Sequence, residues 1–143
     1  MTMENFYEAA VRHWIDGGIL EANGEYDNAV CMAGFAAECA LKAMLETGYA
    51  VHKIRKAYGH RGNEIMQDIT VMLQGDMQLA TVLDPEYGLR LAGIILPGVL
   101  FSDHPDRRYR QDYIYSREDA ESCLNAAYAL IKEMASMRID GYL

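Results

Sequence analysis

The sequence predicts an all-α fold, an up-and-down bundle of four to five helices that forms one domain over residues 1–143. Hydrophobic residues make up 51% of the chain, which is enough to build a core at this length. Proline occurs only three times and methionine nine times, and this composition favours helices over strands. Apolar residues also recur with helical spacing in several segments that turn residues separate.

The first helix is expected over residues 3–22, because Phe6, Ala10 and Trp14 follow helical spacing. Asn23-Gly24 should end it, since both residues tolerate the left-handed conformation that closes many helices.

The second helix is expected over residues 27–47, with Asp27 as its N-cap and Gly48 as its stop. It is apolar on nearly every side, so it should lie at the centre of the bundle. From residue 29 to residue 45 the only charged side chains are Glu38 and Lys42, whose spacing of four predicts a structural ion pair inside the bundle or at a dimer seam. The alternative is a catalytic acid–base pair.

The middle of the chain gives weaker signals. A third helix is expected to begin after Gly59-His60 and to end near Leu73. Residues 84–88 predict a turn or a helix start, and residues 89–96 predict a short buried helix that Pro97-Gly98 interrupts. Residues 102–110 predict a charged loop. Residues 94–101 have the composition of a strand, but no second strand is available to pair with them.

The last helix has the clearest signal. Ser116 and Asp119 have the spacing of a capping box, in which each residue bonds the backbone of the other. A helical stripe of apolar residues follows and should face the core: Ala120, Cys123, Leu124, Ala127, Leu130, Ile131 and Met134.

Charge and composition limit the functional classes. No signal peptide is expected, and the longest apolar run, residues 91–101, is shorter than the roughly 20 residues of a membrane span, so we expect a cytoplasmic protein with no membrane partner. The net charge of −8 argues against non-specific coating of nucleic acid, which basic proteins perform. Cys31, Cys39 and Cys123 lack zinc-binding spacing and should be buried thiols.

Two basic segments stand out in this acidic chain as candidate anion sites. The first, residues 52–61, carries four cations without an acid and precedes a helix N-terminus, where backbone N–H groups favour phosphate. Its candidate binding residues are Lys53, Arg55, Lys56 and Arg61. The second lies within residues 104–110, where arginine can bind phosphate and tyrosine can stack on a base. Its candidates are Arg107, Arg108, Tyr109 and Arg110. The alternative is that both segments only pair with the protein's own acidic groups.

Known catalytic and metal-binding motifs are missing from the sequence. It contains no glycine-rich phosphate loop, no serine nucleophile motif and no zinc motif. Paired Glu-x-x-His motifs, which hold two metal ions in helical bundles, are also missing. We therefore expect no cofactor and no metal.

The residues 29–45, with their Ala-Glu-x-x-Leu-Lys core, resemble the second helix of HEPN domains. Gly59-His60 is similar to the Gly-His pair that many HEPN proteins carry at the start of the next helix. Arg108-Tyr109 and the segment 115–120 resemble the C-terminal part of the same family. The resemblance covers most of residues 3–137 and implies an up-and-down bundle that forms a homodimer.

The resemblance also implies a link to RNA or nucleotides. Many HEPN proteins are metal-independent RNases of toxin–antitoxin or antiviral systems, and others bind nucleotides or accompany a nucleotidyltransferase. Catalytic members carry Arg-x(4–6)-His, often late in the domain. Here Arg55 and His60 match that spacing, but they precede the third helix.

Two functions follow from these observations. In the first, the protein binds RNA or a nucleotide and, if it is catalytic, uses His60 as acid and base while Arg55 stabilises charge on phosphorus. In the second, it is a non-catalytic interaction module, the partner of a nucleotidyltransferase. A nucleotidyltransferase or an antitoxin is thus the expected partner protein. Whether the two basic segments meet at one pocket separates these hypotheses most directly.

Overall fold

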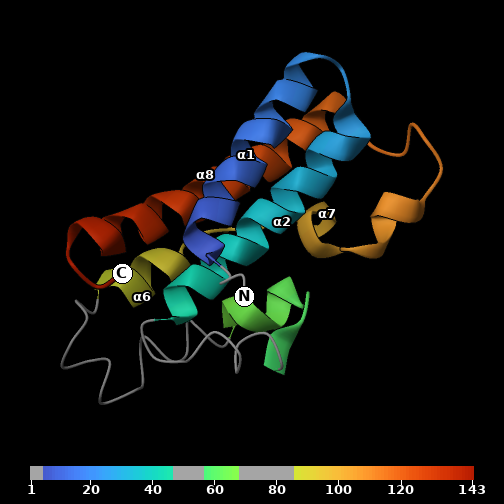
Figure 1. The fold of residues 1–143 in the computed structure, drawn as a ribbon. Coiled ribbons are helices and arrows are strands. Elements are labelled where there is room, and N and C mark those ends of the chain that lie inside the picture. The colour runs from blue at the N-terminus through green and yellow to red at the C-terminus, as the bar shows by residue number, and fades with distance from the viewer. Residues whose placement is uncertain (1–4, 47–56, 68–85) are drawn as a thin grey trace, which may run out of the picture.

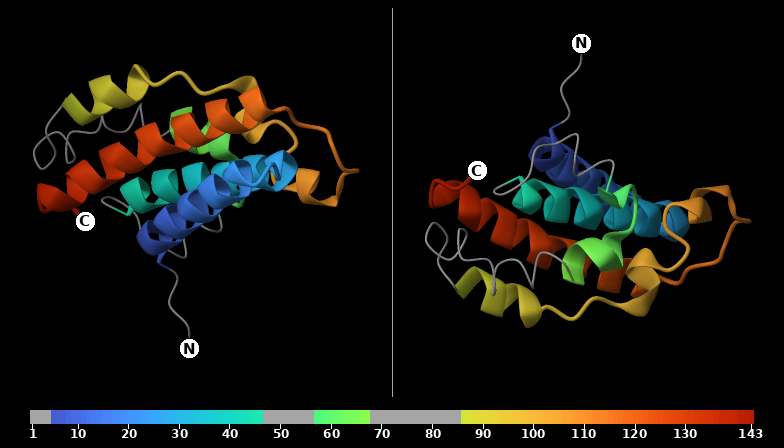
Figure 2. Two further views of the ribbon diagram at one scale, coloured as in Figure 1. Left: turned by 90° about the horizontal axis from the view of Figure 1, so that it is seen from above. Right: turned by 90° about the horizontal axis from the view of Figure 1, so that it is seen from below.

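The computed structural model describes residues 5–46, 57–67 and 86–143. Within these ranges every regular element is a helix and no strand occurs, so the expected all-α fold is confirmed for the part that is described. Three long helices form the body: α1 (Phe6–Ala22), α2 (Tyr26–Leu45) and α8 (Arg117–Ile139). Helix α2 packs against both of the others (Figure 1). The shorter helices and the segment 57–67 cover the remaining side of α2 and α8 (Figure 2).

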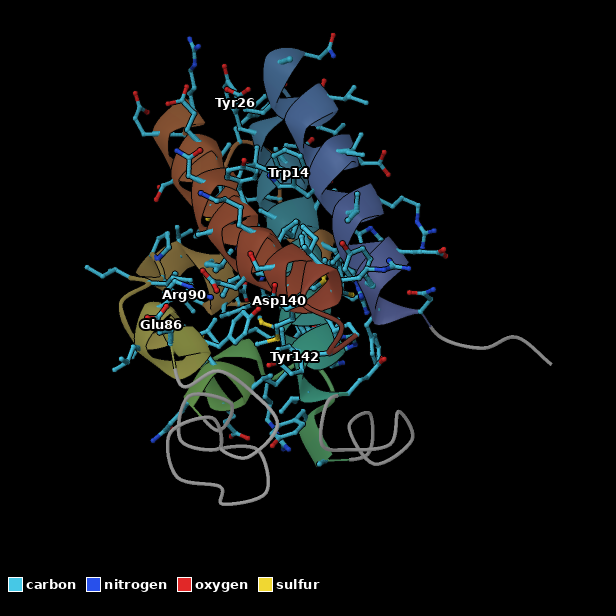
Figure 3. The ribbon with its side chains drawn as sticks, turned by 90° about the vertical axis from the view of Figure 1, so that its left-hand side faces the viewer. Trp14, Tyr26, Glu86, Arg90, Asp140 and Tyr142 are labelled. Atoms are coloured by element: carbon cyan, nitrogen blue, oxygen red, sulfur yellow. The ribbon has the colours of Figure 1, made fainter. Side chains whose placement is uncertain are left out.

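Helix α1 spans Phe6–Ala22. It begins at Asn5, whose side chain accepts a 3.0 Å hydrogen bond from the Glu8 amide, and it ends at Asn23 before Gly24, which has a φ of +77°. Its end is therefore where the sequence predicts it. Trp14 lies between α1 and α8, donates to the Leu124 carbonyl and stacks on Tyr128 (Figure 3).

Helix α2 spans Tyr26–Leu45 and is buried from Ala29 onward except at Met32 and Phe35. Its length and composition would suit a membrane span, but most of its apolar stretch is buried inside the bundle, as in the core helix that the sequence predicts. The expected N-cap is wrong, because the helix begins after Glu25. Asp27 instead accepts the backbone N–H groups of residues 113–115 and ties that loop to the start of α2.

The short helices differ from the expectation in their boundaries. Helix α6 spans Glu86–Ala92, so it begins within residues 84–88, where a turn or a helix start is expected, and it ends before the predicted limit at residue 96. Pro97 is expected to interrupt a helix, and it is also the N-cap of helix α7, which spans Gly98–Phe101. The predicted loop 102–110 contains a 3-10 turn, η1, at Asp106–Tyr109. Arg90 joins α6 to α8 through Glu133 at 2.9 Å (Figure 3).

Helix α8 spans Arg117–Ile139 and starts with the predicted capping box. The Asp119 amide donates to Ser116 Oγ, and the Ser116 amide donates to Asp119 Oδ2, each at 3.1 Å. All seven residues of the predicted apolar stripe are buried. The three cysteines are buried free thiols, also as predicted, and burial raises the pKa of Cys123 to about 11.

The segment 57–67 brings the Gly59-His60 pair to the side of α2. Residues 62–67 are helical, which agrees with the predicted third helix, and the remainder of that prediction lies outside the described residues, as does Gly48. Ile65 is fully buried. A Cβ at Gly62 would lie 2.3 Å from the Phe101 ring, so only glycine allows this segment to press against α7.

Candidate functional site

The centre of the site is Glu38, a carboxylate that is only 3% exposed in the middle of α2. Lys42, one turn later and also buried, lies with its Nζ atom 3.0 Å from Glu38 Oε2, which confirms the predicted ion pair. The same ammonium group donates to the carbonyl of Gly59. A buried charge pair is tolerated only when its hydrogen-bonding groups are satisfied in this way.

The second oxygen of this carboxylate joins two histidines from distant segments. Glu38 Oε1 lies 2.8 Å from His60 Nδ1 and 2.8 Å from His104 Nε2. An ionised carboxylate only accepts hydrogen bonds, so both ring nitrogens must carry a proton here. In its neutral form His60 therefore keeps its proton on Nδ1, and its Nε2 atom carries no proton.

The two histidines differ sharply in exposure. The His104 side chain is completely buried, whereas the His60 side chain is 48% exposed. The free Nε2 atom therefore belongs to a ring that solvent and a ligand can reach. His104 Nδ1 is buried without a hydrogen-bond partner among the residues that the structure describes.

Glu38 stays ionised at this position. Burial alone would raise the pKa of its carboxyl group, but the hydrogen bond from His104, the charge of Lys42 and the hydrogen bond from His60 outweigh burial, so the pKa lies below its ordinary value. An ionised acceptor fixes the orientation of both imidazole rings.

Phe35, one turn before Glu38, lies next to the three histidines that the structure describes. The ring centroids of His13, His60 and His104 lie 5.9, 5.9 and 4.7 Å from that of Phe35. The guanidinium of Arg108 lies 6.0 Å from the same centroid. Arg108 and His60, both exposed, thus contact the same aromatic ring.

The loop after α7 approaches α2 closely because residue 34 is a glycine. A Cβ at Gly34 would lie 2.8 Å from His104 Nδ1 and 2.9 Å from Arg107 Nη2. Arg107 is 4% exposed, and its two terminal nitrogens donate to the carbonyls of Val99 and Leu100. Its guanidinium holds the loop in place, so it is not available to the phosphate ligand for which the sequence suggested it.

Replacing Arg107 by Met should destabilise the protein by at least about 2 kcal/mol, since two buried carbonyls lose a charged donor. Thermal unfolding followed by circular dichroism measures the change. Arg108→Met is the matched control, because that neighbouring arginine is exposed and should leave the midpoint almost unchanged. Equal midpoints for the two variants would contradict the structural role of Arg107.

The remaining predicted site residues are placed as follows. Lys53, Arg55 and Lys56 lie outside the described residues. Arg61 is exposed and pairs with Glu64 at 2.9 Å, and Arg110 is exposed and pairs with Asp103 at 2.7 Å.

Arg108 is exposed and forms no ion pair with any residue that the structure describes, while Tyr109 is 75% exposed beside it, with the Arg108 guanidinium 4.8 Å from its ring. The two basic segments meet where His60 contacts His104, with ring centroids 5.9 Å apart.

A separate groove of about 660 Å³ lies between residues 94–97 and the first half of α8. Its charged lining residues are Glu118 and Glu121, so it would repel a phosphate. For an anionic ligand the surface near His60 and Arg108 is the better candidate.

Sequence reasoning missed the role of His104 and the junction that Glu38 forms. The signal for Glu38 is an acid in an otherwise apolar helix, which usually requires a buried partner. His104 gives no such signal, because it is 66 residues from Glu38 in the chain and meets it only in the fold.

Comparisons with protein-family models, with curated proteins and with solved structures found no match for this chain. The resemblance to HEPN domains therefore rests on the residues of this chain, and what it implies for function is a proposal.

Proposed function

We propose that this chain is a HEPN-like helical protein that binds RNA or a nucleotide next to His60 and Arg108, and that it cleaves RNA without a metal ion. The observation that carries the proposal is the 2.8 Å hydrogen bond between His60 Nδ1 and buried Glu38. It fixes the ring, and Nε2, on a half-exposed side chain, has no hydrogen-bond partner among the residues that the structure describes. An acid–base histidine requires this arrangement.

The proposed reaction is attack of the ribose 2′-hydroxyl on the adjacent phosphorus. His60 Nε2 takes the proton of that hydroxyl while the bond from O2′ to phosphorus forms. The bond from phosphorus to O5′ breaks, and the departing oxygen takes a proton from solvent. The products are a 2′,3′-cyclic phosphate and a 5′-hydroxyl. Glu38 does not touch the substrate but orients His60, as the carboxylate of a catalytic triad orients its histidine.

Arg108 is the described cation best placed to bind the phosphate, because it lies beside Phe35 and is exposed. Arginine can present two parallel hydrogen bonds to a phosphate, and Tyr109 offers a face for a base. Arg61 and Arg110 would have to leave their carboxylate partners first. From sequence alone, Lys53, Arg55 and Lys56 would add positive charge next to His60, with Arg55 stabilising the charge on phosphorus.

The second candidate function is the non-catalytic interaction module with a nucleotidyltransferase or antitoxin partner. The burial of Glu38, Lys42 and His104 favours it, because a buried hydrogen-bond network can have a purely structural role, here holding two loops on α2. Under both functions the predicted homodimer remains part of the proposal.

Arg108→Ala should weaken binding of a fluorescent RNA oligonucleotide about tenfold or more, since a charge-assisted hydrogen bond contributes roughly 1.5–3 kcal/mol. Fluorescence anisotropy at low and at raised salt measures the affinity, and a nucleoside triphosphate serves as the second probe. The slope of the logarithm of affinity against the logarithm of salt concentration should also become shallower, by about the contribution of one phosphate contact.

Arg138→Ala is the matched control for this measurement. Arg138 is also an exposed arginine over an aromatic ring, 4.3 Å from that of Tyr7, but it lies near the C-terminal end of α8. It should bind like the wild type. Binding that is equal in wild type and Arg108→Ala, or undetectable for both probes at low salt, would remove the anion site.

A further inference from the structure

The structure brings three metal-ligating atoms together from three separate segments. Glu38, His60 and His104 each offer a ligand atom within 4.8 Å of the other two. Glu38 Oε1 lies 2.8 Å from both His60 Nδ1 and His104 Nε2. They come from α2, from the turn before the helix at 62–67 and from the loop after α7. No motif with metal-binding spacing connects them in the sequence, so only the fold creates this group.

The distances fit a small dication after a slight adjustment. Zinc lies about 2.0–2.2 Å from nitrogen and oxygen ligands, so two ligands of a tetrahedral ion are about 3.3–3.5 Å apart. The carboxylate oxygen is 2.8 Å from each histidine nitrogen. Each histidine nitrogen would have to move away from the carboxylate oxygen by about half an ångström. The ring of His60 is half exposed and has room for this shift, whereas the ring of His104 is buried and can move only together with its loop.

Lys42 already holds the Glu38 carboxylate in the orientation that a metal needs. Lys42 binds Oε2 at 3.0 Å and also donates to Gly59, the residue before His60. Oε1 is therefore the oxygen that faces the two rings. Hydrogen bonds of this kind to the second oxygen of a ligating carboxylate are a regular feature of metal sites.

When a metal ion binds, each imidazole ring can keep its proton by moving it to its other nitrogen. In the metal-free protein, His60 Nδ1 and His104 Nε2 carry protons that point at the same oxygen. A dication takes the place of both, and each proton moves to the other nitrogen of its ring. His104 Nδ1 has no partner among the described residues in either state, so no hydrogen bond is lost there.

We propose that Glu38, His60 and His104 bind a zinc-type dication, with a fourth position that opens to solvent beside the half-exposed ring of His60. Two imidazoles and one carboxylate suit Zn²⁺ or Co²⁺, whereas Mg²⁺ prefers oxygen ligands only. Lys42 balances the charge of Glu38, so the bound dication keeps a net positive charge that favours water or an anion at the fourth position.

Metal binding would act against the proposed RNA cleavage. Zinc on His60 Nδ1 keeps the proton of a neutral ring on Nε2, so the exposed nitrogen can no longer take a proton from a 2′-hydroxyl. Zn²⁺ is therefore an inhibitor in this proposal. The metal site itself does not depend on cleavage, and its test measures the metal directly.

The test uses the full chain, treated with EDTA and dialysed. Titration with Co²⁺ should give visible absorption bands of a four-coordinate ion that saturate at one equivalent, and calorimetry with Zn²⁺ should give the same stoichiometry. Mg²⁺ should produce no heat of binding. His60→Ala, which removes a half-exposed ligand, should weaken Co²⁺ and Zn²⁺ binding at least tenfold.

His13→Ala is the matched control, because its ring packs on Phe35 but supplies none of the three ligand atoms. It should bind both metals like the wild type. Circular dichroism of each variant checks that the helices are retained. The metal site is overturned if wild type gives no Co²⁺ band and no Zn²⁺ heat, or if His60→Ala binds as tightly as wild type. Neither result decides whether the protein cleaves RNA, because cleavage is measured in EDTA with the metal site empty.

Discussion

His60→Ala is expected to cleave RNA about 10²–10⁴-fold more slowly than the wild type, the usual contribution of a positioned acid–base group. Of the two histidines that bond Glu38, only His60 has an exposed side chain, and Nε2 is its ring nitrogen that does not bond Glu38. A labelled RNA oligonucleotide, incubated with excess protein in EDTA, gives the rate of a single turnover. EDTA excludes a metal-dependent contaminant and keeps the proposed zinc site empty.

Chemical rescue separates a lost acid–base group from a damaged fold. Imidazole added to His60→Ala should restore part of the activity, because it can occupy the space of the missing ring and accept the same proton. It should not accelerate Arg138→Ala, which keeps His60. Two results would sink the catalytic proposal: a wild type that binds RNA but never cleaves it, or a His60→Ala variant that cleaves as fast as wild type. The interaction-module function would then be the better explanation.

Elements whose signals are local could be predicted from the sequence. Helix α8 is an example, because Ser116 and Asp119 cap it and its apolar stripe follows directly. The same holds for the ion pair between Glu38 and Lys42, which helical spacing alone places on one face. In both cases the residues that interact are close in the chain.

Contacts between distant segments could not be predicted in this way. Asp27 is of a residue type that often caps helices, yet its carboxylate accepts hydrogen bonds from the backbone N–H groups of residues 113–115. Those residues are distant in the chain and lie near Asp27 only in the fold. Arg107 and Arg108 are adjacent residues of the same type. Gly34 leaves room for Arg107 to pack against α2, whereas Arg108 stays exposed. Composition therefore predicted a basic patch but not which of its arginines can meet a ligand.

Glu38→Ala is expected to lower the free energy of unfolding by about 3–5 kcal/mol, the usual cost of removing one partner of a buried charge pair. The Lys42 ammonium would remain buried with the Gly59 carbonyl as its one acceptor among the contacts described for it, and His60 and His104 would lose their shared acceptor. Urea unfolding followed by circular dichroism measures the loss as a lower midpoint with an unchanged slope.

Two further variants show whether the loss comes from the unpaired charge. Glu38→Leu combined with Lys42→Met should recover much of the stability, because it removes both charges and keeps most of the volume. Glu121→Ala should leave the midpoint nearly unchanged, since its i,i+4 pair with Arg117 has the same 3.0 Å separation but lies on the surface. If Glu38→Ala unfolds at the wild-type midpoint, Lys42 is not held as a buried charge. In that case the carboxylate cannot be the rigid support that both His60 and the metal site require.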